Sequence, residues 1–159
     1  MRVDQIMTRQ IGTCRPNDSL ERAAKLMWDN DCGCVPVVSG DDGAAHIEGL
    51  ITDRDICMCA SFEGKPLHEL QVAQAMARQV RTCRASDPLG VAEQTMAEGR
   101  VRRLPVLDEQ NALIGMLSLA DLAREAARET TKPQQEIMES EVGDTLASIC
   151  RPVPSAVAG

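Results

Sequence analysis

The pattern of apolar and polar positions in this chain occurs twice. The segment that begins at Val3 returns from Val72 with the same order of positions. In each copy a short extended stretch precedes a helical pattern, two apolar runs follow, and a second helical pattern closes the unit. A unit too small to bury its own apolar face must pack on its copy, so the duplication predicts two repeats with a pseudo-two-fold cleft between them. The recurring positions include Met7/Met76, Cys14/Cys83, Leu20/Leu89, Ala23/Ala92, Met27/Met96, Pro36/Pro105 and Val37/Val106.

Each repeat predicts the order strand, helix, strand, strand, helix. In the first copy, apolar residues at helical spacing run from Leu20 to Met27, and Asp18 and Glu21 are spaced as a capping box at the start of this helix. The apolar runs 35–38 and 104–107 predict strands, turn residues follow at 40–43 and 108–111, and 47–51 and 113–117 predict the returning strands. The last helices begin at Thr52 and Ser118. The fold class is therefore α+β, as two β-α-β-β-α repeats packed with pseudo-two-fold symmetry.

The same pattern sets the expected domain limits. We predict repeat 1 over 1–60, a linker over 61–71, repeat 2 over 72–128 and a partly disordered C-terminal tail over 129–159. The tail carries only one weak helical stripe, made by Val142, Leu146 and Ile149, and no chemistry is assigned to it.

Composition narrows the function classes. The 159 residues include 24 acidic and 17 basic side chains, for a formal charge of −7, which argues against nucleic-acid or anionic-membrane binding. No apolar stretch approaches the roughly 20 residues of a membrane span, and residues 1–10 lack the apolar core of an export signal, so we expect a cytoplasmic protein. The seven cysteines are then expected to be reduced, mostly buried thiols.

The sharpest local signal is a glycine, two apolar residues, a hydroxyl residue and an aspartate three residues later. It occurs with Thr52 and Asp55 and again with Ser118 and Asp121. In one interpretation each pair only caps a helix. In the other, the hydroxyl and carboxylate converge on a ribose, whose hydroxyl groups donate to the carboxylate.

Three arginines, Arg100, Arg102 and Arg103, precede the apolar run at Leu104. They form either a solvated basic face or a phosphate site, because a guanidinium group is a forked partner for phosphate. Neighbouring side chains of a strand point in opposite directions, so Arg102 and Arg103 could each serve one of two symmetry-related clefts.

The remaining candidate chemistry is weak. The Cys32/Cys34 and Cys57/Cys59 pairs allow a metal or redox site, but their one-residue spacer is shorter than that of structural zinc sites, and the second repeat has no equivalent. No phosphate-binding loop, dinucleotide fingerprint or nucleophile motif is present, so we expect no enzyme, no catalytic residue and no metal site.

The tandem repeat, the V-P-V-V and L-P-V-L strands and the closing G-L-I-T-D-R-D-I and G-M-L-S-L-A-D-L segments resemble a pair of CBS domains, the Bateman module. The likeness covers about residues 1–127. It implies adenosyl ligands such as AMP, ADP, ATP or S-adenosylmethionine as regulatory ligands, with no required cofactor. It also implies a disc-like homodimer.

The resemblance also implies two ligand sets. One cleft would use Thr52 and Asp55 for ribose, Val80, Arg81 and Val101 near adenine, and Arg102 for phosphate. The other would use Ser118 and Asp121 for ribose, Ile11, Gly12, Cys32 and Gly33 near the base, and Arg103 for phosphate. We favour the second cleft, because glycines allow a base to approach the backbone.

These observations predict a regulatory module that binds an adenosyl small molecule and signals to a protein target, without nucleic-acid or membrane partners. The alternatives are a ligand-free structural or dimerisation module and a cysteine-based metal or redox sensor.

Overall fold

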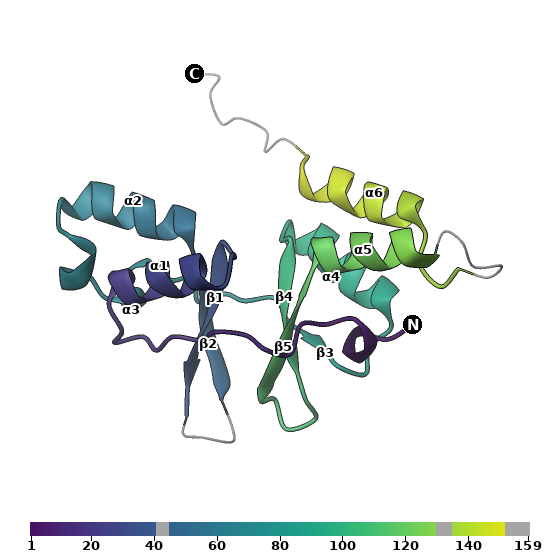
Figure 1. Cartoon of the computed structure of the whole chain (residues 1–159), viewed down its shortest axis with the longest axis horizontal. Coiled ribbons are helices and arrows are strands. Elements are labelled where there is room, and N and C mark those ends of the chain that lie inside the picture. The colour runs from purple at the N-terminus through teal and green to yellow at the C-terminus, as the bar shows by residue number, and fades with distance from the viewer. Residues whose placement is uncertain (41–44, 130–134, 152–159) are drawn as a thin grey trace. The chain divides into compact units, whose positions relative to one another are not determined.

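Each repeat folds into a helix, a strand pair and a second helix, in the predicted order (Figure 1). This computed structural model describes residues 1–40, 45–129 and 135–151, so the predicted turn at 40–43 lies mostly outside the described residues. The first repeat contains α1 (Leu20–Asp29), β1 (Cys34–Ser39), β2 (His46–Thr52) and α2 (Asp53–Glu63). The second contains α4 (Leu89–Gly99), β4 (Arg103–Leu107), β5 (Leu113–Ser118) and α5 (Leu119–Glu129). The expected mixture of helices and strands in two repeats is confirmed.

The extended stretch that opens each repeat joins its sheet. In the first repeat, β1 and β2 pair antiparallel, and Cys14 pairs in parallel with Val37 beside them. The backbone N–H of Cys14 donates to the Pro36 carbonyl at 3.1 Å, and that of Val38 donates to the Cys14 carbonyl at 2.9 Å. In the second repeat the equivalent stretch forms β3 (Cys83–Arg84), and the sheet order is β3-β4-β5.

The chain divides into two compact units that do not coincide with the two repeats. The first-repeat unit comprises Arg9–Val80 and Leu107–Gly115, and the second-repeat unit comprises Met1–Thr8, Arg81–Val106 and Met116–Gly159. The opening segment of each repeat, 1–8 or 72–80, therefore belongs to the unit of the other repeat, and residues Leu107–Gly115 of the second repeat belong to the first-repeat unit.

Backbone hydrogen bonds hold each of these opening segments in the unit of the other repeat. Within the second-repeat unit, the short helix η1 (Val3–Gln5) is held by the Val3 N–H, which donates to the Asp87 carbonyl at 3.0 Å. Within the first-repeat unit, α3 (Val72–Ala75) follows η2 (Leu67–Glu69), and Leu50 and Ala77 exchange hydrogen bonds at 2.9 and 2.8 Å. Gly49 permits this approach, because a Cβ atom there would lie 2.7 Å from the Ala77 carbonyl oxygen.

The start of α1 differs from the predicted capping box. Ser19 is the N-cap, and its hydroxyl accepts from the backbone N–H of Arg22 at 3.2 Å. Asp18 instead accepts from the backbone N–H of Arg15 at 2.8 Å and pairs with the Arg22 side chain. The Asp18/Glu21 capping box was therefore wrong, because Asp18 closes the preceding turn and the helix begins one residue later.

The tail contains a helix that packs on the second repeat. Helix α6 (Glu139–Ile149) contacts α4 and α5 and buries Val142, Thr145 and Ile149 (Figure 1). The buried carboxylate of Glu129 anchors its approach by accepting from the backbone N–H groups of Glu136 at 2.6 Å and Ile137 at 3.1 Å. Residues 130–134 and 152–159, on which part of the expected tail disorder falls, lie outside the described residues. Across the described helices, none is both long enough and apolar enough to cross a membrane.

Candidate ligand-binding site

The first hydroxyl–carboxylate pair is built on the junction of β2 and α2. Thr52 is the N-cap of α2, and its Oγ1 accepts from the backbone N–H of Asp55 at 3.2 Å. Asp55 Oδ2 accepts from the Thr52 hydroxyl at 2.7 Å and from the Thr52 backbone N–H at 2.9 Å. The capping interpretation is thus confirmed by contacts, and both side chains remain partly exposed. One carboxylate oxygen, Oδ1, receives no hydrogen bond from any described residue.

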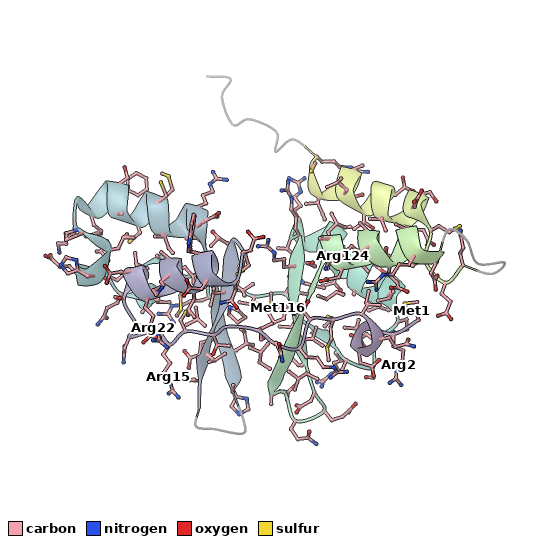
Figure 2. The ribbon with its side chains drawn as sticks, viewed as in Figure 1. Met1, Arg2, Arg15, Arg22, Met116 and Arg124 are labelled. Atoms are coloured by element: carbon pink, nitrogen blue, oxygen red, sulfur yellow. The ribbon has the colours of Figure 1, made fainter. Side chains whose placement is uncertain are left out.

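The second pair repeats this geometry where β5 meets α5. The Ser118 hydroxyl donates to Asp121 Oδ2 at 2.6 Å, the Ser118 N–H donates to the same oxygen at 2.8 Å, and the Asp121 N–H donates to the hydroxyl at 3.2 Å. Here the other oxygen is engaged, because the Arg124 guanidinium forms an ion pair with Asp121 Oδ1. Arg124 projects from α5 and is labelled in Figure 2. The Asp121 side chain is only 7% exposed.

Both candidate phosphate-binding arginines line one hollow of the second-repeat unit. This hollow, of about 420 Å³, is bordered by Arg102, Arg103 and Ser118, and by Val142 and Leu146 of α6. Asp121 instead borders a smaller polar hollow of about 240 Å³ together with Arg124 and Arg128. The structure thus brings the two arginines and Ser118 together but places the Asp121 carboxylate beside a different hollow.

Helix α6 forms one side of the hollow lined by Arg102 and Arg103, and the sequence did not predict this contribution. Besides its apolar lining, the helix is followed by Cys150, whose sulfur lies 3.6 Å from Arg102 Nη2. The stripe of Val142, Leu146 and Ile149 was visible in the sequence and could have indicated a packed helix, but not the surface on which it packs.

The residues expected near the base belong to both units. Val80, Ile11, Gly12, Cys32 and Gly33 lie in the first-repeat unit, whereas Arg81 and Val101 lie in the second-repeat unit. Cys32 and Gly33 border a largely apolar hollow of about 600 Å³, which neither Thr52 nor Asp55 borders. The other side chains around this hollow include Ala24, Met27, Trp28, Ile56, Cys57 and Leu67.

The cysteines differ in burial and ionisation. Burial raises the pKa of Cys14 to about 12, with a further rise from the negative charge of Asp18. Burial likewise raises the pKa of Cys83 to about 12, with Asp87 adding to the effect. Cys57 and Cys150 are exposed. Within the described ranges, no three or more His, Cys, Asp or Glu side chains gather as a group that could hold a metal ion.

Comparison with known proteins places these features in a family. The model of the CBS domain family matches residues 3–60 and 72–128. The chain is 36% identical over 121 residues to the CBS domain-containing protein YhcV of Bacillus subtilis (strain 168), which covers 76% of this chain and 82% of that protein. The chain therefore belongs to the CBS domain family and carries a tandem CBS pair, a regulatory rather than catalytic module. It is also 30% identical to the homoserine O-acetyltransferase of Methanohalobium evestigatum, but it spans only 23% of that enzyme.

Solved structures agree with this assignment. A protein with CBS domains from Burkholderia ambifaria MC40-6 is 30% identical, with a TM-score of 0.70 over 85% of this chain and 98% of that one. CBSX2, solved in complex with AMP, is 26% identical, with a TM-score of 0.67 over 80% and 96% of the two chains. The CBS domain pair of protein MJ0100, solved with 5-methylthioadenosine and S-adenosyl-L-methionine, is 25% identical, with a TM-score of 0.65 over 78% and 98%.

Proposed function

We propose that this chain is a cytoplasmic regulatory module that binds an adenosyl ligand in the clefts between its CBS repeats and signals to a protein target. The ligand is AMP, ADP, ATP or S-adenosylmethionine. Binding biases the module between two states through a difference in the ligand's affinity for them, and the target responds to that bias.

The observation that carries this proposal is the repeated hydroxyl–carboxylate helix start. In both repeats the aspartate uses Oδ2 for the cap. The capping role therefore leaves Oδ1 of Asp55 as an acceptor for sugar hydroxyl groups, whereas Oδ1 of Asp121 is paired with Arg124. The Arg102 and Arg103 guanidinium groups beside Ser118 supply forked donors for a phosphate. The adenosyl compounds bound by CBSX2 and by the MJ0100 pair support the same ligand class.

Phosphate contacts would separate the adenosyl ligands from one another. AMP, ADP and ATP carry negative charge that an arginine can neutralise, whereas S-adenosylmethionine carries a sulfonium cation. We therefore expect Arg102→Gln and Arg103→Gln to weaken nucleotide binding more than S-adenosylmethionine binding.

Isothermal titration calorimetry with AMP, ADP, ATP and S-adenosylmethionine tests the proposal. We expect saturable heat with at least one of the four, and a loss of that heat when both Asp55 and Asp121 are replaced by alanine in a folded protein. Flat traces with all four ligands would refute adenosyl binding.

We further propose that the module is a homodimer whose contact surface includes α1 and α2. The only aromatic side chains of the chain, Trp28 and Phe62, lie on these helices and are 87% and 79% exposed. In the second-repeat unit, α6 packs on the corresponding helices α4 and α5. Large exposed apolar side chains of this kind are typical of protein–protein contact surfaces.

A ligand-free structural or dimerisation module is the second candidate. The observation that favours it is that each hydroxyl is already used twice, as a donor to the aspartate and as an acceptor from its backbone N–H. This candidate predicts no thermal shift with any nucleotide, whereas adenosyl binding predicts a shift that grows with ligand concentration.

A further inference from the structure

The two aspartates of the repeated helix starts differ in one contact. Asp55 and Asp121 occupy equivalent positions, and each receives the same two hydrogen bonds on Oδ2. Three residues later the repeats diverge, because α5 has Arg124 where α2 has Met58. The guanidinium of Arg124 pairs with Asp121 Oδ1. No described residue donates to Asp55 Oδ1.

This contact matters because the cap leaves only one oxygen fully available. A carboxylate that accepts two hydrogen bonds on Oδ2 must use Oδ1 to bind the two neighbouring hydroxyl groups of a ribose. On Asp121 a charged donor already occupies that oxygen, and hydrogen bonds to charged groups are stronger than those between neutral groups. A sugar hydroxyl would have to displace the guanidinium to bind there.

Burial adds to the difference between the two carboxylates. The Asp121 side chain is 7% exposed, so little of it faces solvent while Arg124 is in place. Asp55 is partly exposed. Met58, whose thioether cannot form an ion pair, is itself 42% exposed. Nothing at this position of α2 competes with a ligand for the carboxylate.

We propose that Arg124 is a specificity-determining residue that makes the two ribose sites unequal, so that Asp55 provides the high-affinity nucleoside site and Asp121 is withheld. This inference rests on the proposed adenosyl-binding function. It reverses the preference for the Ser118 and Asp121 cleft that the glycines had suggested.

Reciprocal exchange of the two residues tests the inference. In calorimetry with AMP, the wild type is expected to show one high-affinity site per chain. Arg124→Met is expected to strengthen binding at the second site by roughly two- to fivefold, and Met58→Arg to weaken the first site by a similar factor, because the Arg124 side chain is 63% exposed and solvent weakens its ion pair with Asp121. Arg128→Met is the matched control, because Arg128 lies on the same helix and pairs with Glu125 at 3.4 Å rather than with Asp121.

An AMP analogue that lacks one ribose hydroxyl group separates ribose recognition from an effect on folding. 2′-Deoxy-AMP lacks one of the two sugar hydroxyl groups, so it should bind the wild type more weakly than AMP, and Asp55→Ala should remove this discrimination. Asp121→Ala should leave it in place. Circular dichroism of each variant verifies the fold.

The results distinguish the inference from the function on which it rests. Two equal sites in the wild type, or a high-affinity site that survives Asp55→Ala but not Asp121→Ala, would overturn the role of Arg124 while adenosyl binding stands. Absence of heat in the wild type with all four adenosyl ligands would instead refute the proposed function.

Discussion

Glu93 of α4 and Glu141 of α6 are two carboxylates brought together by the packing of the tail helix. Glu93 Oε1 is fully covered and, among the described residues, has no hydrogen-bond partner. Burial raises the pKa of Glu93, and the negative charge of Glu141 raises it further. The ionised form of Glu93 therefore opposes the contact between α4 and α6 at neutral pH.

Replacing Glu93 by glutamine should stabilise the protein at neutral pH by a few tenths to about 1 kcal/mol, because the change removes the charge and Glu93 retains some solvent contact. The raised pKa of Glu93 determines how the free energy of unfolding changes with pH. Protonation of Glu93 favours the folded state, so the wild type should approach the stability of Glu93→Gln as the pH falls through the folded-state pKa. Urea unfolding at neutral and mildly acidic pH measures both effects.

Glu98→Gln is the control for this prediction, because Glu98 is an exposed residue of the same helix. An equal gain from both substitutions would point to the net charge of the protein rather than to Glu93. A loss of stability in Glu93→Gln would contradict the assignment of an unfavourable charge.

The cap of α2 should contribute to stability independently of any ligand. Thr52→Val keeps the shape of the side chain but removes the hydroxyl that accepts from Asp55 and donates to it. We expect a loss of about 1 kcal/mol in the free energy of unfolding, measured by urea denaturation. Thr95→Val is the matched control, because the Thr95 hydroxyl bonds to the Val91 carbonyl within a helix and caps nothing. Equal losses from the two substitutions would mean that the cap itself contributes little.

The sequence could predict the elements and the paired motifs because both depend on local spacing. The apolar runs and helical stripes placed the strands and helices of each repeat within about two residues, and the glycine–hydroxyl–aspartate spacing identified both helix starts. The prediction of Asp18 as the helix cap was wrong for a local reason. Asp18 and Ser19 are both good capping residues, and a shift of the helix start by one residue decides between them.

Non-local contacts could not be predicted in this way. Nothing in the spacing indicated that residues 1–8 pack with the second repeat, because that choice depends on pairings such as Thr8 with Met116. The contact of Arg102 with Cys150 joins residues 48 positions apart and depends on where α6 packs. The Asp121–Arg124 pair is a local contact at a three-residue spacing on a helix, but it is not among the positions that the repeats share, because Met58 stands at the equivalent position of the first repeat.

In the folded protein, the buried Cys14 and Cys83 should resist alkylation, whereas the exposed Cys57 and Cys150 should react. Alkylation requires the thiolate, and Cys14 and Cys83 have pKa values raised to about 12. At mildly alkaline pH, iodoacetamide followed by peptide mass spectrometry should label Cys57 and Cys150 and leave Cys14 and Cys83 unmodified in the folded protein. All four should react in urea. Rapid labelling of Cys14 or Cys83 under native conditions would contradict their burial.

The same pKa shifts predict a loss of stability in alkali. In the unfolded chain these thiols ionise near their ordinary pKa of 9.0, whereas in the folded protein they keep their protons until about 12. The unfolded state therefore binds fewer protons between these values, and the free energy of unfolding should fall as the pH rises through this window. Cys14→Ala should make that decline shallower, because the variant lacks one of the two thiols with a raised pKa. Identical slopes in the wild type and Cys14→Ala would contradict the contribution of this thiol.

The exposed aromatic side chains of the first repeat give the proposed dimer its sharpest test. Sedimentation equilibrium of the wild type should show a dimer, and the double change Trp28→Gln with Phe62→Gln should weaken the association by at least roughly a hundredfold, because large aromatic side chains dominate the energetics of such contacts. Val91→Gln is the control, because Val91 is 47% exposed but lies on α4 of the second repeat. Trp28 is the only tryptophan of the chain, so its fluorescence should shift to shorter wavelength as the wild type associates. A wild type that remains monomeric with an unshifted, solvent-exposed Trp28 spectrum would exclude α1 and α2 as a self-association surface, and dimers that persist in the double variant would place the contact elsewhere.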